Sequence, residues 1–286
     1  MKNRVIALLY LLIGLVNISQ ADTSVWKVSQ GDHYFYLGGT FHMLAPEDYP
    51  LEPEYMQAYQ DADRLYFETD MAAANAPEFL AQAQKDMLLQ GQTLNEVLKP
   101  KVYTKVEAYI ESRQLSMSMF NSFKPDAVML ALATLEYMRL GNKASLGVDT
   151  YFQKLNTTKK EYYFETPEEQ MAFLSSFGDE DPNELVTLSL DQLSTLGNDI
   201  ERIKMLWRNG LAAELYQYYK ETSDGHATQA MDDVLIKQRN LNWMNTINTF
   251  MESSEVEFVL VGALHMGGPN GLIALLEHKG YQVKQL

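Results

Sequence analysis

Two histidines of this chain stand in the same local pattern although they lie far apart in the sequence. The segments "GTFH", ending at His42, and "GALH", ending at His265, each follow a run of residues with the composition of a β-strand. Only five histidines occur among the 286 residues, so a repeated setting for two of them indicates a shared role. The leading glycine permits either a positive φ angle or the close approach of a neighbouring segment.

Two glutamates also end predicted strands. Glu68 follows the apolar part of "RLYFETD", and Glu165 ends "EYYFE". In open α/β sheets functional groups gather just beyond the carboxyl ends of the strands, so these glutamates can meet His42 and His265 at one edge. Two imidazoles with one or two carboxylates form a donor set suited to Mn, Fe, Co or Zn, with positions left for water or substrate.

Such a donor set predicts metal-assisted hydrolysis. A bound metal lowers the pKa of a water molecule and polarises a carbonyl group, and a carboxylate that is not a ligand can take the proton. The sequence leaves open whether Glu68 is the third ligand or the general base. It also leaves open a simpler interpretation, in which each histidine only forms structural hydrogen bonds at its strand end.

The sequence around these motifs predicts the elements that hold them. Aromatic and β-branched runs predict strands over Val25–Ser29, His33–Thr40, Arg64–Asp70, Glu161–Glu165, Val256–Gly262 and Tyr281–Lys284. Apolar residues at spacings of three and four predict helices over Pro53–Ala62, Glu78–Gln90, Leu94–Leu98, Lys101–Ser112, Lys124–Leu140, Pro167–Phe177, Asn183–Leu196, Ile200–Tyr219, Ala230–Met251 and Gly271–His278. The expected fold is α/β (mixed α+β), a central β-sheet flanked by helices, with a helical insertion between the two Gly-x-x-His halves.

Residues 1–21 have the form of a secretory signal peptide. A basic start is followed by the short apolar run from Val5 to Val16, and small residues precede a cleavage point after Ala21. The alternative is an uncleaved membrane anchor. Cleavage would leave residues 22–286 as a single domain that is periplasmic or secreted and has no stable membrane anchor. The absence of cysteine argues against a lipid anchor and excludes disulfide bonds and thiolate chemistry.

The chain is strongly acidic. Its formal net charge is −15, and removal of Lys2 and Arg4 with the signal, which contains no acidic residue, takes the charge to −17. Such a surface repels nucleic acid and anionic lipid headgroups, because both are bound through Lys and Arg. Cations and cationic peptides would be attracted, although the charge can equally serve solubility alone. The oligomeric state is left open.

Two stretches of the sequence resemble a known family. "YLGGTFHM" and "FVLVGALHMGGPNGLIALLEHKGYQV" are similar to the TraB/GumN family, related to the Tiki peptidases, whose signature is a pair of Gly-x-x-His motifs and a glutamate. "LYFETD" resembles the family strand that ends in the signature acid, which gives Glu68 that place. The resemblance extends over nearly all of residues 24–286.

Three further segments carry family residues over to this chain. "LGVDTYF" resembles a Gly-x-Asp segment and gives Asp149 a site role. "FETPEEQMAFL" is similar to a stretch that carries over Glu165 and Gln170, and "KQRNLNWM" resembles an Arg-Asn segment that carries over Arg239 and Asn240. Taken without the resemblance, Asp149 could instead cap the turn that follows it, and Arg239 could lie on the surface of an amphipathic helix.

The resemblance implies a secreted or surface α/β protein with a metal-dependent hydrolase site. On this hypothesis a divalent transition metal is bound by His42, His265 and Glu68. The catalytic residues are Glu68, Arg239, Glu165 and Asp149, and the substrate-binding residues are Asn240 and Gln170. Arg239 would bind a developing oxyanion or a terminal carboxylate. The substrate would be a peptide or another small amide or ester, and the alternative is a non-catalytic metal- or ligand-binding envelope protein of the same fold.

Overall fold

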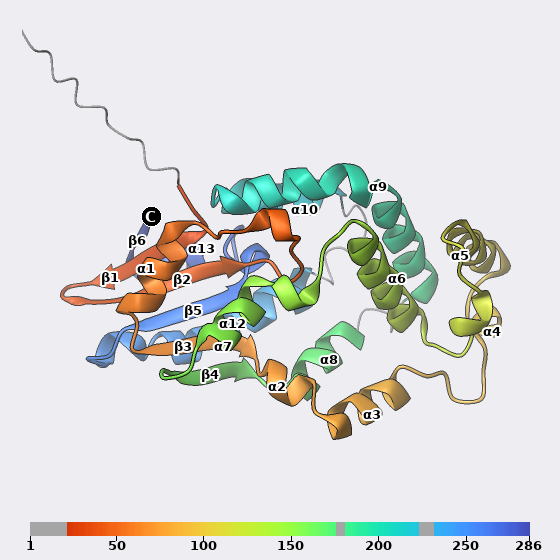
Figure 1. Ribbon diagram of the computed structural model, residues 1–286, viewed down its shortest axis with the longest axis horizontal. Helices are drawn as coiled ribbons and strands as arrows, with labels where there is room; N and C mark the ends of the chain where they lie inside the picture. Colours follow the sequence, from red (N-terminus) through yellow and green to blue (C-terminus); the bar gives the residue numbers. More distant parts are fainter. Residues whose placement is uncertain (1–21, 176–180, 223–231) are drawn as a thin grey trace, which may run out of the picture.

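The protein is built on a six-stranded sheet with the strand order β4-β3-β5-β2-β1-β6 (Figure 1). The computed structural model describes residues 22–175, 181–222 and 232–286. The strands are β1 Val25–Gln30, β2 His33–Thr40, β3 Arg64–Thr69, β4 Lys160–Glu165, β5 Glu257–Gly262 and β6 Gln282–Gln285. Each of them lies where the sequence predicts a strand. β2, β5, β3 and β4 are mutually parallel, whereas β1 pairs antiparallel with both β2 and β6.

Helices fill most of the described chain between the strands, and six of the α-helices begin with a proline at their first position, where the missing N–H costs nothing. The α-helices are α1 Pro53–Asp61, α2 Met71–Ala74, α3 Pro77–Asp86, α4 Leu94–Val97, α5 Pro100–Ser112, α6 Pro125–Arg139, α7 Val148–Leu155, α8 Pro167–Ser175, α9 Pro182–Arg208, α10 Ala212–Thr222, α12 Arg239–Ile247 and α13 Leu272–His278. Short 3-10 helices are η1 Pro46–Asp48, η2 Met117–Met119, η3 Ala144–Leu146, η6 Phe250–Glu252 and η7 Ala263–His265, and η5 Asp233–Gln238 is a π-helix.

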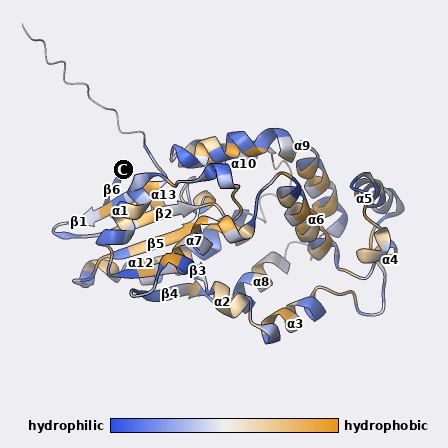
Figure 2. Cartoon of the chain, viewed as in Figure 1, coloured by the Kyte–Doolittle hydropathy of each residue, from blue (hydrophilic) through white to orange (hydrophobic). Residues whose placement is uncertain are grey.

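The sheet is covered on both faces. One face packs against α1, α7, the end of α9 and α10, through buried side chains such as Phe152 and Trp207. The other face packs against α12 and α13, through Trp243 and Leu272. β5 is buried along its whole length, and Figure 2 shows the hydrophobic residues that run along β3 and β5. The result is the expected α/β arrangement, with a sheet between layers of helices.

A second group of helices lies to one side of the sheet. The chain from α2 to α7 leaves after β3 and returns to β4, and α4, α5 and α6 pack with α9 around a separate apolar core that includes Val106, Leu132 and Leu193 (Figure 1). We call α2 to α6, α8 and the first half of α9 the helical part.

The break predicted between Leu196 and Ile200 is wrong. α9 continues to Arg208, and the chain turns only at Gly210, whose φ angle is +57°. A glycine inside a helix costs about 1 kcal/mol relative to alanine, but α9 offsets this cost because its buried face extends past Gly197 to Trp207. A Cβ at Gly210 would collide with the Thr23 carbonyl group.

The long helix predicted over Ala230–Met251 is divided. Within the described residues it consists of the π-helix η5, then α12, then the 3-10 helix η6. The first two residues of that prediction and the whole predicted signal segment 1–21 lie outside the described residues. None of the described helices is both long and apolar enough to cross a lipid bilayer.

Glu257, at the start of β5, is a buried carboxylate whose stability effect can be tested. Glu257 is 1 % exposed. Within the described part of the chain, neither of its carboxylate oxygens accepts a hydrogen bond, although Arg64 Nη2 lies 3.4 Å from Oε1. Burial raises the pKa of Glu257 from 4.5 to about 7, against the attraction of Arg64. The folded state therefore keeps a proton that the unfolded state loses, and the free energy of unfolding falls as the pH rises from about 4.5 to 7.

We expect Glu257→Gln to raise the free energy of unfolding by about 2 kcal/mol near pH 8 and to bring no gain near pH 4. Urea unfolding at both pH values measures this. The control is Glu255→Gln. Glu255 contacts the same Arg64 but is about half exposed, so its replacement should change the free energy of unfolding by less than about 0.5 kcal/mol. Equal gains for Glu257→Gln at both pH values would contradict the buried-charge explanation.

Candidate active site

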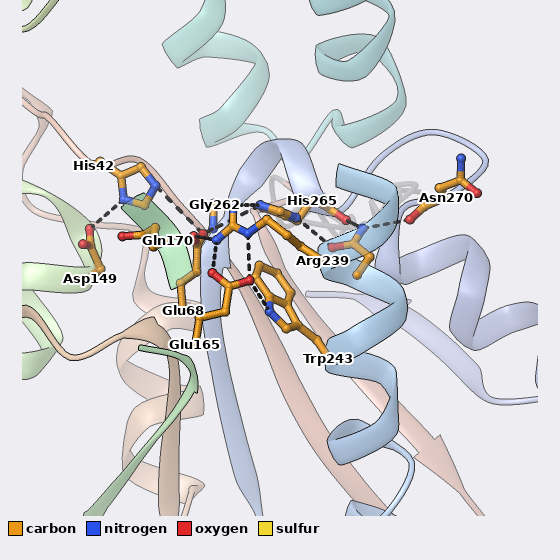
Figure 3. A network of polar contacts seen from close by, with 11 residues as sticks. His42, Glu68, Asp149, Glu165, Gln170, Arg239, Trp243, Gly262, His265 and Asn270 are labelled. Carbon is orange, nitrogen blue, oxygen red and sulfur yellow. Dashed lines mark hydrogen bonds and ion pairs between the residues drawn. The ribbon is translucent and has the colours of Figure 1, made fainter. Parts of the chain in front are cut away.

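The carboxyl ends of the parallel strands meet at one edge of the sheet. His42 follows the end of β2, Glu68 is the penultimate residue of β3, Glu165 ends β4, and His265 ends η7, directly after β5. Figure 3 shows that their side chains converge around the guanidinium group of Arg239, from α12. The two histidines and two glutamates that the sequence places at strand ends therefore lie together.

Gly262, the last residue of β5, leaves an open space between three of these side chains. A Cβ atom there would lie 3.2 Å from Glu68 Oε1, 3.4 Å from His42 Nε2 and 3.6 Å from His265 Cδ2. Its φ angle is −48°, so the glycine serves the close approach of neighbours and not a left-handed backbone. The Gly262 N–H donates a 2.6 Å hydrogen bond to Glu68 Oε1.

Glu68 is the central acceptor of the site. Its Oε1 lies 3.9 Å from His42 Nε2 and 4.0 Å from His265 Nε2. Its Oε2 accepts hydrogen bonds from Arg239 Nη2 at 2.6 Å and Gln170 Nε2 at 3.3 Å. Burial alone would raise the pKa of Glu68, but the positive charge of Arg239 and the Gly262 N–H hold it far below its usual range, so this carboxylate is ionised.

His265 is buried and neutral, because burial lowers its pKa to about 3 against the attraction of Glu68. The amide of Asn240 donates to the carbonyl oxygens of His265 and Asn270, at 3.0 and 2.8 Å, which fixes the orientation of that amide. Asn240 Oδ1 then lies 2.7 Å from His265 Nδ1, so we assign the ring proton to Nδ1. The lone pair of His265 Nε2 faces the site, where Arg239 Nη1 lies 3.2 Å away.

His42 is held from the opposite side by Asp149. The two residues form an ion pair of 3.4 Å between Nδ1 and Oδ1, and the His42 side chain is 58 % exposed within the cleft. Burial of the ring between the cleft walls lowers its pKa, but Asp149 and then Glu68 outweigh this and raise it to about 9. α7 approaches His42 closely because Gly147, its N-cap, has no side chain: a Cβ there would lie 2.3 Å from the His42 carbonyl oxygen. Asp149 thus faces His42 and does not cap α7.

Arg239 is buried at the centre of the site and not on a helix surface. Its Nε and Nη2 donate to the two oxygens of Glu165, both at 2.8 Å, and the residue is 5 % exposed. Nη2 also bonds Glu68, so one guanidinium connects two buried carboxylates. Arg239 directly follows the π-helix η5. Such segments are rare and often occur at functional sites.

Trp243 completes this arrangement, although no sequence motif identified it as part of the site. Its Nε1 donates to Glu165 Oε1 at 2.9 Å, and its ring lies 4.9 Å from the Arg239 guanidinium carbon and 4.4 Å from the His265 ring centre. The signal for it was present, because Trp243 follows Arg239 by four residues and therefore lies on the same face of α12.

The structure places the remaining predicted site residues as follows. Asn240, a predicted substrate-binding residue, is completely buried, and its amide contacts His265. Glu165, a predicted catalytic residue, has both oxygens engaged by Arg239 and Trp243. Gln170, the other predicted substrate-binding residue, lines a cavity beside Glu68.

Within the described part of the chain, no group of three or more His, Cys, Asp or Glu side chains is placed to hold a metal ion. The donor types at the site, two imidazoles and a carboxylate, are nevertheless those of a divalent transition-metal site. Both histidines direct Nε2 toward Glu68 Oε1, and each has its Nδ1 beside an acceptor, as in protein metal sites. In a tetrahedral site, metal–ligand bonds of about 2.0–2.2 Å place neighbouring donors about 3.3–3.6 Å apart. The observed separations of 3.9 and 4.0 Å from Glu68 Oε1 are slightly longer, so the donors would have to draw closer around an ion in the open space beside Gly262.

Comparisons with known proteins show what this chain is similar to. The profile of the "TraB/PrgY/gumN family" matches residues 24–285. The chain is similar to the "Uncharacterized protein YbaP" of Escherichia coli, with 24 % identity over 271 residues that cover 88 % of this chain and 97 % of that protein. It is also similar to the "Metalloprotease TIKI1" of Danio rerio, with 28 % identity over 104 residues, 35 % of this chain and 20 % of that protein. No solved structure matches it.

Proposed function

This chain belongs to the TraB/PrgY/gumN family, and from that premise and the site geometry we propose that it is a metal-dependent hydrolase of peptide or related amide bonds. The observation that carries the proposal is the arrangement of His42 Nε2 and His265 Nε2 on either side of one ionised oxygen of Glu68, next to a buried arginine. The partial similarity to a protein named as a metalloprotease supports the same chemistry.

In this proposal His42, Glu68 and His265 hold a divalent transition metal, Mn, Fe, Co or Zn. Such an ion, when bound, supplies a Lewis acid for a carbonyl group and a water molecule of lowered pKa. The oxygens of Glu68 already accept hydrogen bonds from Gly262 and Arg239, so their position is fixed before any ligand binds. This favours Glu68 as a ligand over Glu68 as a mobile general base.

The surrounding residues orient the reacting groups. Asp149 and Asn240 hold the Nδ1 sides of the two imidazoles, which directs both Nε2 atoms toward the open space. Glu165 and Trp243 hold Arg239 so that its positive charge stays next to Glu68 and His265. A fixed positive charge at this point would stabilise the oxyanion that forms when a carbonyl carbon is attacked.

A non-catalytic binding protein is the second candidate. One observation favours it: Arg239 Nη1 lies 3.2 Å from His265 Nε2 and so engages the lone pair that a metal would need. Protein purified without chelator should be analysed for metal and then incubated with a broad peptide pool in the presence of Mn, Fe, Co or Zn. Metal-dependent cleavage supports the hydrolase. Tight metal or ligand binding with no cleavage of peptide, ester or amide pools would contradict the hydrolase proposal and support a binding protein.

The metal assignment makes a separate prediction. We expect His42→Ala and His265→Ala each to abolish stoichiometric metal binding, because each removes one of three ligands, while the sheet stays folded. The matched control is His33→Ala, an exposed histidine on β2 whose ring contacts the Ser253 carbonyl group. Elemental analysis of the four proteins measures the result. Full metal content in both site variants would contradict the assignment.

A further inference from the structure

The site lies at the junction of two cavities. One, of about 360 Å³, extends along β3 toward α2 and α7. The other, of about 550 Å³, extends toward α9 and α10. The wall residues common to both are His42, Met43, Glu68, Leu235 and Arg239. A molecule bound at Glu68 can therefore extend in two directions from it.

The larger cavity meets a third one in the helical part. This third cavity, of about 290 Å³, lies between α6, α8 and α9, and it shares Tyr137, Gln192 and Leu196 with the larger cavity. Figure 1 shows α6 and α9 side by side, away from the strands. The three cavities thus follow one another from α7, across the site, to the space between α6, α8 and α9.

The walls of the third cavity are mainly apolar. They include Met129, Leu130, Met171, Leu185 and Leu193. Leu130 is 40 % exposed, so its side chain is accessible to a ligand in this cavity. Methionines adapt to irregular apolar side chains, which suits a groove that accepts more than one sequence.

Charge restricts what can bind along this path. Arg239 is the only Lys or Arg among the described residues that line the three cavities, and two carboxylates already hold it. The walls carry additional carboxylates at Asp126, Asp149 and Asp199. An acidic ligand would be repelled, whereas a neutral or basic chain with apolar side chains would not.

We propose that the three cavities form one groove for an extended polypeptide, and that the groove between α6, α8 and α9 binds an apolar side chain located several residues from the bond at Glu68. The statement that this bond is the one cleaved rests on the proposed hydrolase function. A polypeptide fits because it is thin, advances about 3.3 Å per residue and places side chains on alternate sides, so it can fill cavities that are joined in a row. A single small molecule would fill only one of them.

The chain offers a matched pair of variants for the test. Leu130 and Leu135 both lie on α6 and are both 40 % exposed, but Leu130 lines the third cavity and Leu135 lies on another face of the helix. The probes are fluorescently labelled peptide pools of about twelve residues, which extend to about 40 Å. One pool carries leucine at scanned positions and the other carries serine. Binding is followed by fluorescence anisotropy with the full chain.

We expect Leu130→Asp to weaken binding of the leucine pool by about tenfold, the effect of one lost leucine contact, and Leu135→Asp to change it by less than about twofold. Binding of peptides of about four residues, which extend to only about 13 Å, should depend less on Leu130 than binding of the longer peptides. Equal effects of the two variants, no effect of either, or displacement of the peptides by a fluorescent fatty acid would overturn the proposal.

Cleavage is measured in parallel and decides a different question. Leucine-dependent binding that is lost in Leu130→Asp, together with no turnover under any metal condition, would reject the hydrolase and retain the peptide groove. Turnover of peptides with no dependence on Leu130 would retain the hydrolase and reject the groove.

Discussion

Glu68→Gln is expected to reduce peptide turnover by about 10²–10⁴-fold while the protein remains folded. The change removes the negative charge that lies between His42 Nε2 and His265 Nε2, and with it the charge that would hold a divalent ion there in the proposed hydrolase. The amide oxygen can still accept the Gly262 N–H, so the end of β5 keeps its hydrogen bond. Measurement of kcat/KM, metal content and the unfolding transition of the same preparations separates loss of chemistry from loss of structure.

Glu257→Gln is the control for Glu68→Gln, because it makes the same chemical change at another buried glutamate of the same sheet. Glu257 starts β5, at the opposite end of that strand from Gly262, and lines none of the three cavities. The kcat/KM of Glu257→Gln should equal that of the unchanged protein. Full activity in Glu68→Gln would remove this residue from the reaction and, with it, the proposed site.

The central strands could be predicted because their composition requires burial. After Glu257, β5 reads as an uninterrupted apolar run from Phe258 to Val261, and a run of that kind without helical spacing is typical of a strand in the middle of a sheet. α9 was harder, because Gly197 looks like a local stop. Whether a glycine ends a helix depends on what the next turn can bury, and the burial of Trp207 against Phe41 at the end of β2 is not visible in the local sequence.

The residues of the site could be named from the sequence, but their division into roles could not. Glu165 and Arg239 are separated by 74 positions, and only the fold shows that both Glu165 oxygens face that guanidinium. Asn240 looks like a polar residue that could face a substrate. Its neighbour Arg239 points into the site, whereas Asn240 turns toward the backbone carbonyls of His265 and Asn270. Roles of this kind follow from hydrogen-bond geometry, which spacing does not encode.

The groove could be predicted from the sequence even less than the roles of the site residues could. Its apolar residues on α6 and α9 have the spacing of ordinary core positions, and most of the apolar residues of these helices are core positions. Only the exposure of Leu130, and the cavity that continues from it to Glu68, distinguish this face from the packed one.

Arg239→Met is expected to have the largest effect on stability, lowering the free energy of unfolding by about 3–5 kcal/mol at neutral pH. Methionine keeps an unbranched side chain beside Trp243 but loses the guanidinium that lies over its ring, and it leaves Glu68 and Glu165 buried together without a positive charge between them. Urea unfolding measures this loss. Turnover should disappear as well, because the positive charge beside Glu68 and His265 is removed.

Arg113→Met controls for the loss of an arginine that pairs with a buried carboxylate. Arg113 bonds Glu136, which is 3 % exposed, but Glu136 also holds Arg139 through a 2.6 Å contact and so keeps a positive partner when Arg113 is replaced. The expected loss is below about 1 kcal/mol. If Arg239→Met costs no more than Arg113→Met, then Glu68 and Glu165 do not depend on Arg239 for their charge. The guanidinium would then be free to leave Glu68, and a binding protein in which Arg239 follows its ligand would explain the site better than a hydrolase with a fixed charge.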